Sequence, residues 1–154
     1  MDEDLNRTVS AFRTLVTTLN RAKTHERLTA AAGVRLDRPD VQILVHLLDG
    51  GPRRIGLIAE GLQVESPHVT RHVAALEQRG LVERVRDPDD GRAWRIALTE
   101  EGAEVAGRCR RVTTDWFEGA LAEWSEADRA DLSRLMGRLS DDLCSHLKER
   151  ATLK

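Results

Sequence analysis

The residue pattern changes abruptly at Gly80, and this change limits the chain to few folds. In the segment before it, apolar residues are spaced by four and three positions, as on the buried face of a helix. Ser66 is predicted to be the N-cap of this helix and Pro67 its first residue, while Gly80 ends it. Residues 81–86 and 93–98 are predicted strands, because the turn-rich sequence Asp-Pro-Asp-Asp-Gly between them is typical of a hairpin. A short helix, a capped helix and a hairpin in succession predict a winged helix-turn-helix.

Helical spacing of apolar residues predicts five other helices around this segment. The stretch 5–32 contains no proline and is predicted to be one long helix that ends at Gly33. A second helix is expected to begin at Asp37 or Arg38, and Gly50 to Pro52 stop it. The remaining three are expected at residues 55–62, from 99 to about 124, and from 125 onward, with Thr99 and Ser125 as caps. The predicted fold class is mainly α with a small β-hairpin wing.

Composition narrows the classes of function. The 154 residues suit one domain, and 24 basic against 26 acidic side chains give a net charge of −2. A polycationic DNA-binding protein is therefore excluded, and any nucleic-acid surface must be local. Two cysteines cannot form a disulfide framework, and no apolar run approaches the roughly 18 residues of a membrane span. The acidic amino terminus also lacks the order of a signal peptide, so we expect a cytoplasmic protein with no membrane partner.

The capped helix and the hairpin together resemble the MarR family of bacterial regulators. The resemblance is carried by the run 62–82, which contains Thr-Arg, Leu-Glu and Gly-Leu-Val, by the wing sequence 86–92 and by Leu-Thr-Glu-Glu-Gly at 98–102. It covers roughly residues 55–102. The fold itself suits duplex DNA, because an α-helix fits the major groove and an arginine at a hairpin tip can reach the minor groove.

The resemblance implies a two-fold symmetric homodimer that reads an inverted repeat in double-stranded DNA. Helices from both ends of the chain would interlock as the dimer platform. Residues 1–36 and 100–154 would form this helical dimerisation region. Residues 37–99 would form the winged helix-turn-helix region that binds DNA, and both would belong to one integrated domain.

The same resemblance suggests which side chains contact DNA. Arg92 would enter the minor groove, with Asp87 and Asp90 holding it in position. Gly91 departs from the pattern, because many relatives carry a second basic residue at the wing tip. The recognition-helix and hairpin residues predicted to contact DNA are Ser66, Pro67, His68, Thr70, Arg71, His72, Arg86 and Arg92.

Other interpretations of single residues stay open. His68 and His72 are one turn apart and could hold zinc, but the same outward face is needed for DNA, so a phosphate or base contact is the better interpretation. Cys109 lies among three arginines that favour a reactive thiolate, although an inert thiol is the default for Cys109 and Cys144. A metal site in the dimer would use His25, His46 and His146 with a cysteine, but their spacing gives no support. A small-molecule pocket could be lined by Phe12, His46 and Trp116.

The winged helix-turn-helix pattern predicts a DNA-binding protein, and the resemblance to the MarR family implies a sequence-specific transcriptional regulator, most simply a homodimeric repressor that a small effector releases from an inverted-repeat operator. The sequence contains no Gly-rich phosphate loop and no nucleophile paired with a base, so we expect no enzyme, cofactor or metal. A metal- or redox-responsive regulator of the same fold is an alternative. A winged helix that serves protein–protein contact is another, but it would not need Thr70, Arg71 and Arg92 together at groove-reading positions.

Overall fold

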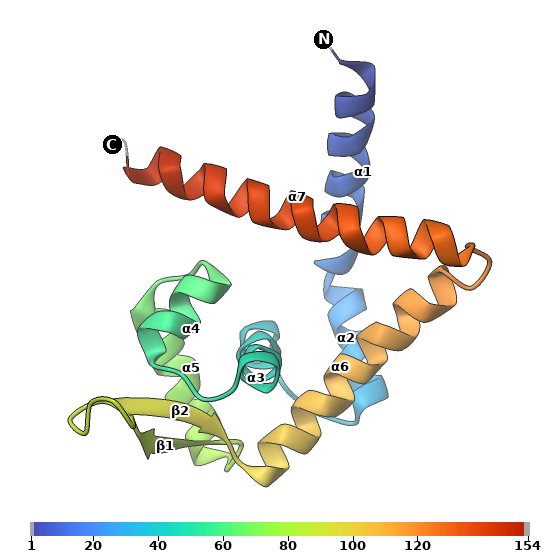
Figure 1. The fold of residues 1–154 in the computed structure, drawn as a ribbon. Coiled ribbons are helices and arrows are strands. Elements are labelled where there is room, and N and C mark those ends of the chain that lie inside the picture. The colour runs from blue at the N-terminus through green and yellow to red at the C-terminus, as the bar shows by residue number, and fades with distance from the viewer. Residues whose placement is uncertain (1, 153–154) are drawn as a thin grey trace. The chain divides into compact units, whose positions relative to one another are not determined.

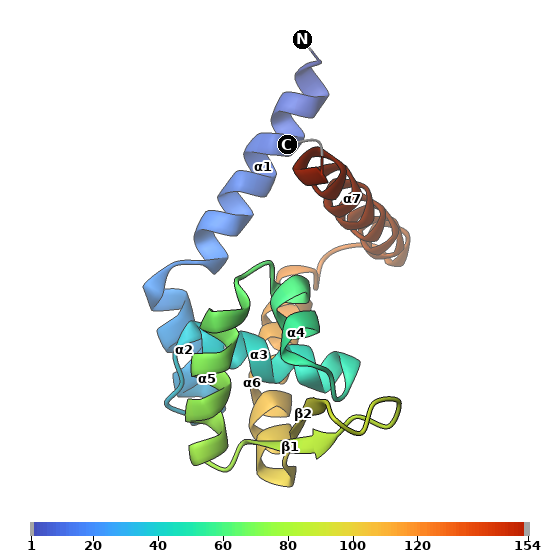
Figure 2. The same ribbon diagram turned by 90° about the vertical axis from the view of Figure 1, so that its left-hand side faces the viewer.

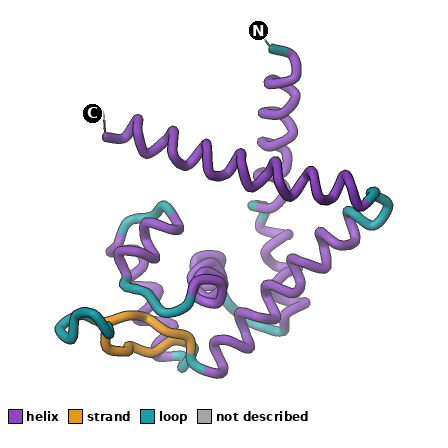
Figure 3. Tube along the Cα trace, viewed as in Figure 1, coloured by secondary structure: helices purple, strands orange, loops and turns teal. Residues whose placement is uncertain are grey.

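The computed structural model describes residues 2–152, which form seven helices and a two-stranded antiparallel sheet (Figures 1 and 3). The fold class predicted from the sequence is confirmed. Contacts divide the chain into two compact units, residues 1–114 and 115–154, with the boundary inside α6. In chain order the elements are α1 (Glu3–Leu19), α2 (Ala22–Ala32), α3 (Arg38–Gly50), α4 (Ile55–Leu62), α5 (Ser66–Gln78), β1 (Val82–Arg86), β2 (Trp94–Leu98), α6 (Glu100–Ala120) and α7 (Glu126–Thr152).

The single long helix predicted for residues 5–32 is wrong, because the chain breaks after Leu19 into α1 and α2. Asn20 ends α1, and Arg21 has an extended backbone with φ −64° and ψ 142°. The carbonyl groups released at the break find other donors: the Thr24 hydroxyl donates to Thr18 O at 2.7 Å, and the Arg38 guanidinium donates to Asn20 O. The sequence has no proline or glycine at the break, and the helical spacing of apolar residues does not reveal it.

The hydrophobic core of the first unit surrounds α3, which contacts α4, α5 and β2 (Figures 1 and 2). Asp37 caps this helix by accepting a hydrogen bond from the Asp40 backbone N–H at 3.3 Å. The recognition-helix candidate α5 turns its apolar face toward α3 and is fixed there by burial. The largest side chains that are almost fully buried are Ile43, Leu44, Ile58, Leu76, Ile96, Val69, Val73 and Cys109.

The start of α5 differs by one residue from the sequence prediction. Glu65 occupies the N-cap position without a side-chain hydrogen bond, so Ser66 is the first helical residue and Pro67 the second. The prediction that the Ser66 hydroxyl caps this helix is therefore wrong. At the other end, Gly80 follows the C-cap with φ +71°, a left-handed conformation that glycine adopts without steric cost.

The hairpin and the two later helix caps agree with the sequence predictions. Strands β1 and β2 pair antiparallel in the register Val82↔Leu98 to Arg86↔Trp94. The Thr99 hydroxyl accepts from the Gly102 backbone N–H at 3.0 Å at the start of α6. Ser125 does the same for Asp128 at 3.1 Å at the start of α7.

Apolar side chains remain exposed on α1 in the first unit and on α7 in the second. No residue of α1 is buried in the described part of the chain. Its exposed apolar residues are Leu5, Val9, Phe12, Leu15, Val16 and Leu19. On α7 the exposed apolar residues are Leu135, Met136, Leu139, Leu143 and Leu147. Within residues 2–152, no helix is both long and apolar enough to cross a membrane.

Candidate nucleic-acid interface

The exposed side of α5 is set by the residues that anchor its opposite side. Val69 and Val73 are fully buried, so Thr70 and Arg71 between them lie on the exposed surface. The Thr70 hydroxyl donates to Ser66 O at 3.0 Å, which fixes its rotamer. The Arg71 guanidinium has no hydrogen bond or ion pair to any described residue. All of its donors are therefore available to an external acceptor such as a guanine edge.

The two histidines of α5 lie in different environments. His68 is half-buried in the first turn, and its ring lies against His72 with the ring centroids 4.6 Å apart. His72 was expected to face outward, but its side chain is only 20% exposed, and Nδ1 lies 2.8 Å from Asp40 Oδ1 on α3. Burial raises the pKa of the Asp40 carboxyl, and the hydrogen bond from His72 opposes that shift. This contact joins α5 to the first turn of α3.

The wing is anchored by a buried carboxylate at its base. The Asp87 side chain is only 3% exposed, and its Oδ2 accepts from Arg54 Nε at 2.8 Å and from Arg95 Nε at 3.1 Å. Its Oδ1 accepts from the backbone N–H groups of Asp89 and Asp90 at 2.9 and 3.2 Å. The Arg54 guanidinium, with these other donors, holds the pKa of Asp87 far below its usual range. Asp87 therefore stays ionised and fixes the wing to the start of α4 and to β2.

The structure agrees only in part with the prediction that Asp87 and Asp90 hold Arg92 in position. Asp90 Oδ1 accepts from the Arg92 backbone N–H at 3.1 Å, whereas Asp87 contacts Arg54 and Arg95 and makes no contact with the Arg92 guanidinium. Both acidic residues thus shape the turn and leave the Arg92 side chain free of hydrogen bonds to the described residues. Arg92 is exposed at the tip of the wing, where a minor-groove contact would require it.

Arg86 is more restrained than its predicted DNA-contacting role suggested. Its Nη1 donates to Gly91 O across the turn at 2.8 Å. Its guanidinium carbon lies 4.0 Å from the centre of the Trp94 ring, a cation–π contact. Arg86 therefore stiffens the hairpin, and its remaining donors are exposed for a phosphate contact.

The sequence reasoning missed Arg54 and Asp40. Arg54 is separated from Asp87 by 33 residues, and no local pattern connects the two. Asp40 and His72 could have been found, because each occupies a core-facing helical position. Residue 40 extends the buried set 43, 44 and 47, and residue 72 extends the buried set 69, 73 and 76. Polar groups at such positions require partners, and these two are paired with each other.

The residues considered for a ligand pocket or a reactive thiol are placed as follows. His46 is half-buried on α3 and accepts from Arg53 Nη1 at 3.0 Å, and burial together with the Arg53 charge lowers its pKa. Phe12 is exposed on α1, and Trp116 belongs to the second unit, so the pocket stays a prediction. Cys109 is buried and burial raises the pKa of its thiol, which disfavours the thiolate that oxidant sensing needs.

Comparison with known proteins identifies similar sequences and folds. The model described as "MarR family" matches residues 36–94. An uncharacterized HTH-type transcriptional regulator of Bacillus subtilis, YpoP, is 30% identical over 104 residues, 68% of this chain and 74% of that protein. The HTH-type transcriptional regulator BilQ of Clostridioides difficile is 27% identical over 84 residues, 54% of this chain and only 57% of BilQ. The crystal structure of Streptococcus pneumoniae FabT in complex with DNA is 19% identical and covers 92% of this chain and 96% of that one, with a TM-score of 0.67; this likeness shows the fold.

Proposed function

Since this chain belongs to the MarR family of DNA-binding transcriptional regulators, we propose that it acts as a homodimeric repressor of an inverted-repeat operator and that a small effector releases it. One observation supports the DNA-binding part of the proposal: two exposed arginines each project from an element that is held firmly in place. Arg71 projects from a helix whose other side is buried, and Arg92 from a wing fixed by Asp87.

Each arginine suits one groove. The amino-terminal half of the second helix of a helix-turn-helix enters the major groove, and Thr70 and Arg71 lie in that half of α5. An arginine that contacts guanine with two hydrogen bonds contributes about 1–3 kcal/mol of base discrimination. Arg92 at the wing tip is suited to the adjacent minor groove, whose potential is most negative over A·T-rich sequence. Ser66, Pro67 and His68 flank these contacts in the first turn, while His72 and Arg86 are already engaged within the protein.

The exposed apolar faces of α1 and α7 are each suited to a second copy of the chain. Contiguous exposed apolar surface of this kind marks protein–protein contact sites. In a two-fold dimer, residues 1–36 and 100–154 would form the interface, and the two copies of α5 would lie about 34–36 Å apart, one turn of DNA. An effector that binds better to a dimer with a different spacing weakens DNA binding by linkage.

Two measurements test this function. The first is fluorescence anisotropy of the chain with its own upstream DNA, at two salt concentrations and with competitor DNA. Tight binding to an inverted repeat that weakens as salt rises is expected; weak binding indifferent to sequence would refute the proposal. The second is sedimentation of Leu15→Glu, on the apolar face of α1, beside Arg13→Glu as a control on its polar side. Only the first variant is expected to be monomeric.

A further inference from the structure

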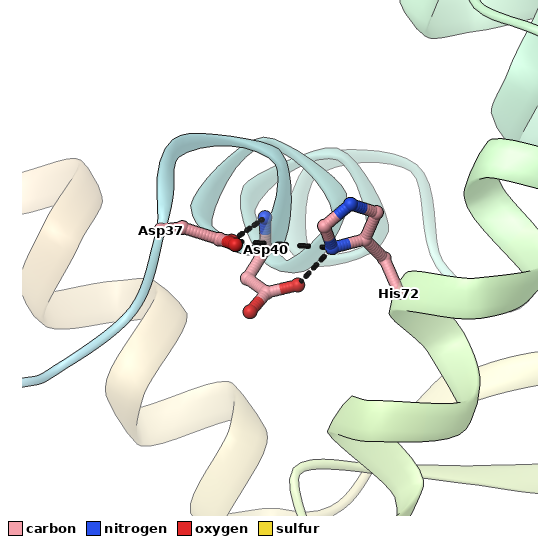
Figure 4. Close-up of side chains that lie close together, drawn as sticks. All are labelled: Asp37, Asp40 and His72. Atoms are coloured by element: carbon pink, nitrogen blue, oxygen red, sulfur yellow. Dashed lines mark hydrogen bonds and ion pairs between the residues drawn. The ribbon is translucent and has the colours of Figure 1, made fainter.

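Three side chains with metal-ligating atoms converge where α5 crosses the start of α3. Figure 4 shows Asp37, the N-cap of α3, and Asp40 in its first turn, with the His72 imidazole of α5 directed at their carboxylates. His72 Nδ1 lies 2.8 Å from Asp40 Oδ1 and 3.9 Å from Asp37 Oδ1. One ligand atom from each of the three residues lies within 4.8 Å of the other two.

The cluster combines a buried carboxylate with access from solvent. Asp40 is only 8% exposed and occupies a core-facing position, as does His72 on the opposing helix. The Asp37 side chain, in contrast, is 62% exposed, so an ion and its coordinated water molecules can reach the group from that side. Two carboxylates beside one imidazole carry an excess of negative charge, which attracts a cation.

We propose that Asp37, Asp40 and His72 bind one divalent transition-metal ion that joins the recognition helix α5 to the first turn of α3. Ligand atoms bonded to one such ion at about 2.0–2.2 Å lie about 3.0–3.4 Å apart when adjacent. The Nδ1 distances of 2.8 and 3.9 Å lie within about half an ångström of this range, whereas the Asp37 and Asp40 ligand oxygens, which lie within 4.8 Å of each other, would have to approach by up to about 1.4 Å. The imidazole nitrogen favours zinc, copper, iron or nickel over calcium, magnesium and manganese, which prefer oxygen ligands. This site departs from the expectation that the chain binds no metal.

The position of the site gives it a consequence for DNA binding, which rests on the proposed function. His72 is one residue beyond Arg71, so an ion at this site would fix the part of α5 that carries the base-reading side chain. It would do so through α3, which lies in the core of the same unit. The ion would then act as an effector by stabilising one orientation of α5 relative to α3.

Binding is tested without DNA. The full chain, freed of metal with a chelator, is titrated in a calorimeter with Zn²⁺ alone and with Mn²⁺ alone, in a buffer that does not bind metal. We expect one ion per chain, tighter binding of Zn²⁺ than of Mn²⁺, and a Tm that rises with metal concentration. Absence of saturable binding by both ions would overturn the proposal.

Three variants locate the ion. Asp37→Asn removes a charged ligand but keeps an oxygen that can cap α3, so the fold is preserved. His72→Gln removes the imidazole, and His68→Gln, one turn earlier on α5, is the matched control. We expect the first two to weaken Zn²⁺ binding by more than about tenfold, since losing even an outer partner of a metal ligand costs 10–100-fold. Unchanged affinity in Asp37→Asn and His72→Gln would place the ion elsewhere and overturn the assignment.

The effect on DNA binding is then measured separately. Zn²⁺ at saturation should change the operator affinity of the parent chain by about 5–150-fold, the usual size of such coupling, and leave that of Asp37→Asn unchanged. A parent chain that binds Zn²⁺ with no change in operator affinity would refute the effector role. If neither protein bound DNA with or without metal, the proposed function would fail while the calorimetric assignment of the site stood.

Discussion

At Gly102, helix α6 lies very close to Leu81, the residue just before the wing. A methyl group added at Gly102 should therefore destabilise the fold strongly. A Cβ at Gly102 would lie 1.8 Å from the backbone oxygen of Leu81 and 2.8 Å from its carbonyl carbon. Ordinary contact requires about 3.4 Å, so α6 or the start of the wing would have to move by about 1.6 Å. The Leu81 oxygen also accepts from the Thr99 backbone N–H at 3.1 Å, and this bond would be strained. The obstacle is backbone, which cannot rotate away as a side chain can.

We therefore expect Gly102→Ala to reduce the free energy of unfolding by about 3 kcal/mol, the upper end of the usual range for overpacking. For a chain of this length the Tm should fall by about 6–12 °C. Gly107→Ala, five residues further along the same helix, is the matched control, because its Cβ would meet no atom within 4 Å. It should stabilise the chain by about 0.5–1 kcal/mol through helix propensity. Thermal unfolding followed by far-UV circular dichroism, at one protein concentration, compares the three proteins. If Gly102→Ala were as stable as the parent, α6 would not lie this close to Leu81.

Four further predictions concern the proposed DNA-binding surface. Arg71→Ala should lower operator affinity by about 5–150-fold and flatten the preference at one base pair, measured by anisotropy on single-base operator variants. Arg92→Ala should weaken binding to operators with A·T-rich flanks and leave Tm unchanged, whereas Arg134→Ala, on an exposed ion pair of α7, should change neither. Arg54→Ala should reproduce the loss of binding expected for Arg92→Ala, although Arg54 itself need not touch DNA, because the wing would lose one of its anchors. Unchanged affinity would show that the wing is held by β2 alone. Asp87→Asn should lower stability in urea unfolding at pH 7, and its difference from the parent should shrink as pH falls below about 4. The reason is that the Asp87 pKa is depressed in the folded chain, so its contribution is full above the unfolded pKa and is lost only as pH falls through the folded one. A difference that stays constant between pH 7 and pH 3 would show that ionisation of Asp87 is not its source.

The parts of the fold that could be predicted from the sequence are those fixed by local geometry. The hairpin followed from its turn residues, and the starts of α6 and α7 from Thr99 and Ser125, because a cap acts within three residues of its own position. The break between α1 and α2 was missed, and one of its supporting contacts is not local: Arg38 donates to the Asn20 carbonyl from 18 residues away. The Asn20–Arg21 step carries no turn residue strong enough to indicate it.

The same distinction separates the predicted site residues from the missed ones. Exposure of Arg71 follows from its place opposite the buried face of one helix, which a single segment reveals. The partners of Asp87 could not be found in this way, since hydrogen bonding with Arg54 depends on how the segment before α4 lies beside β2, where Arg53 pairs with Ile96. The sequence predicted that acidic residues of the turn support the wing, but the family resemblance assigned them to Arg92. In the structure the buried carboxylate is paired with arginines that can also be partly buried, and the arginine at the tip is left for an external partner.

The two elements proposed to contact DNA are thus each held by a polar contact to the helices that support them. His72 connects α5 to Asp40 on α3, and Asp87 connects the wing to Arg54 at the start of α4. Helix α3 contacts α4, α5 and β2, so a displacement of α3 would move both the helix and the wing. Apolar packing alone would allow small sliding between these elements, whereas a hydrogen bond to a buried carboxylate allows only one alignment at low cost. An effector that alters either contact would therefore change the spacing between Arg71 and Arg92 within one chain, in addition to any change in the spacing between the two copies of a dimer.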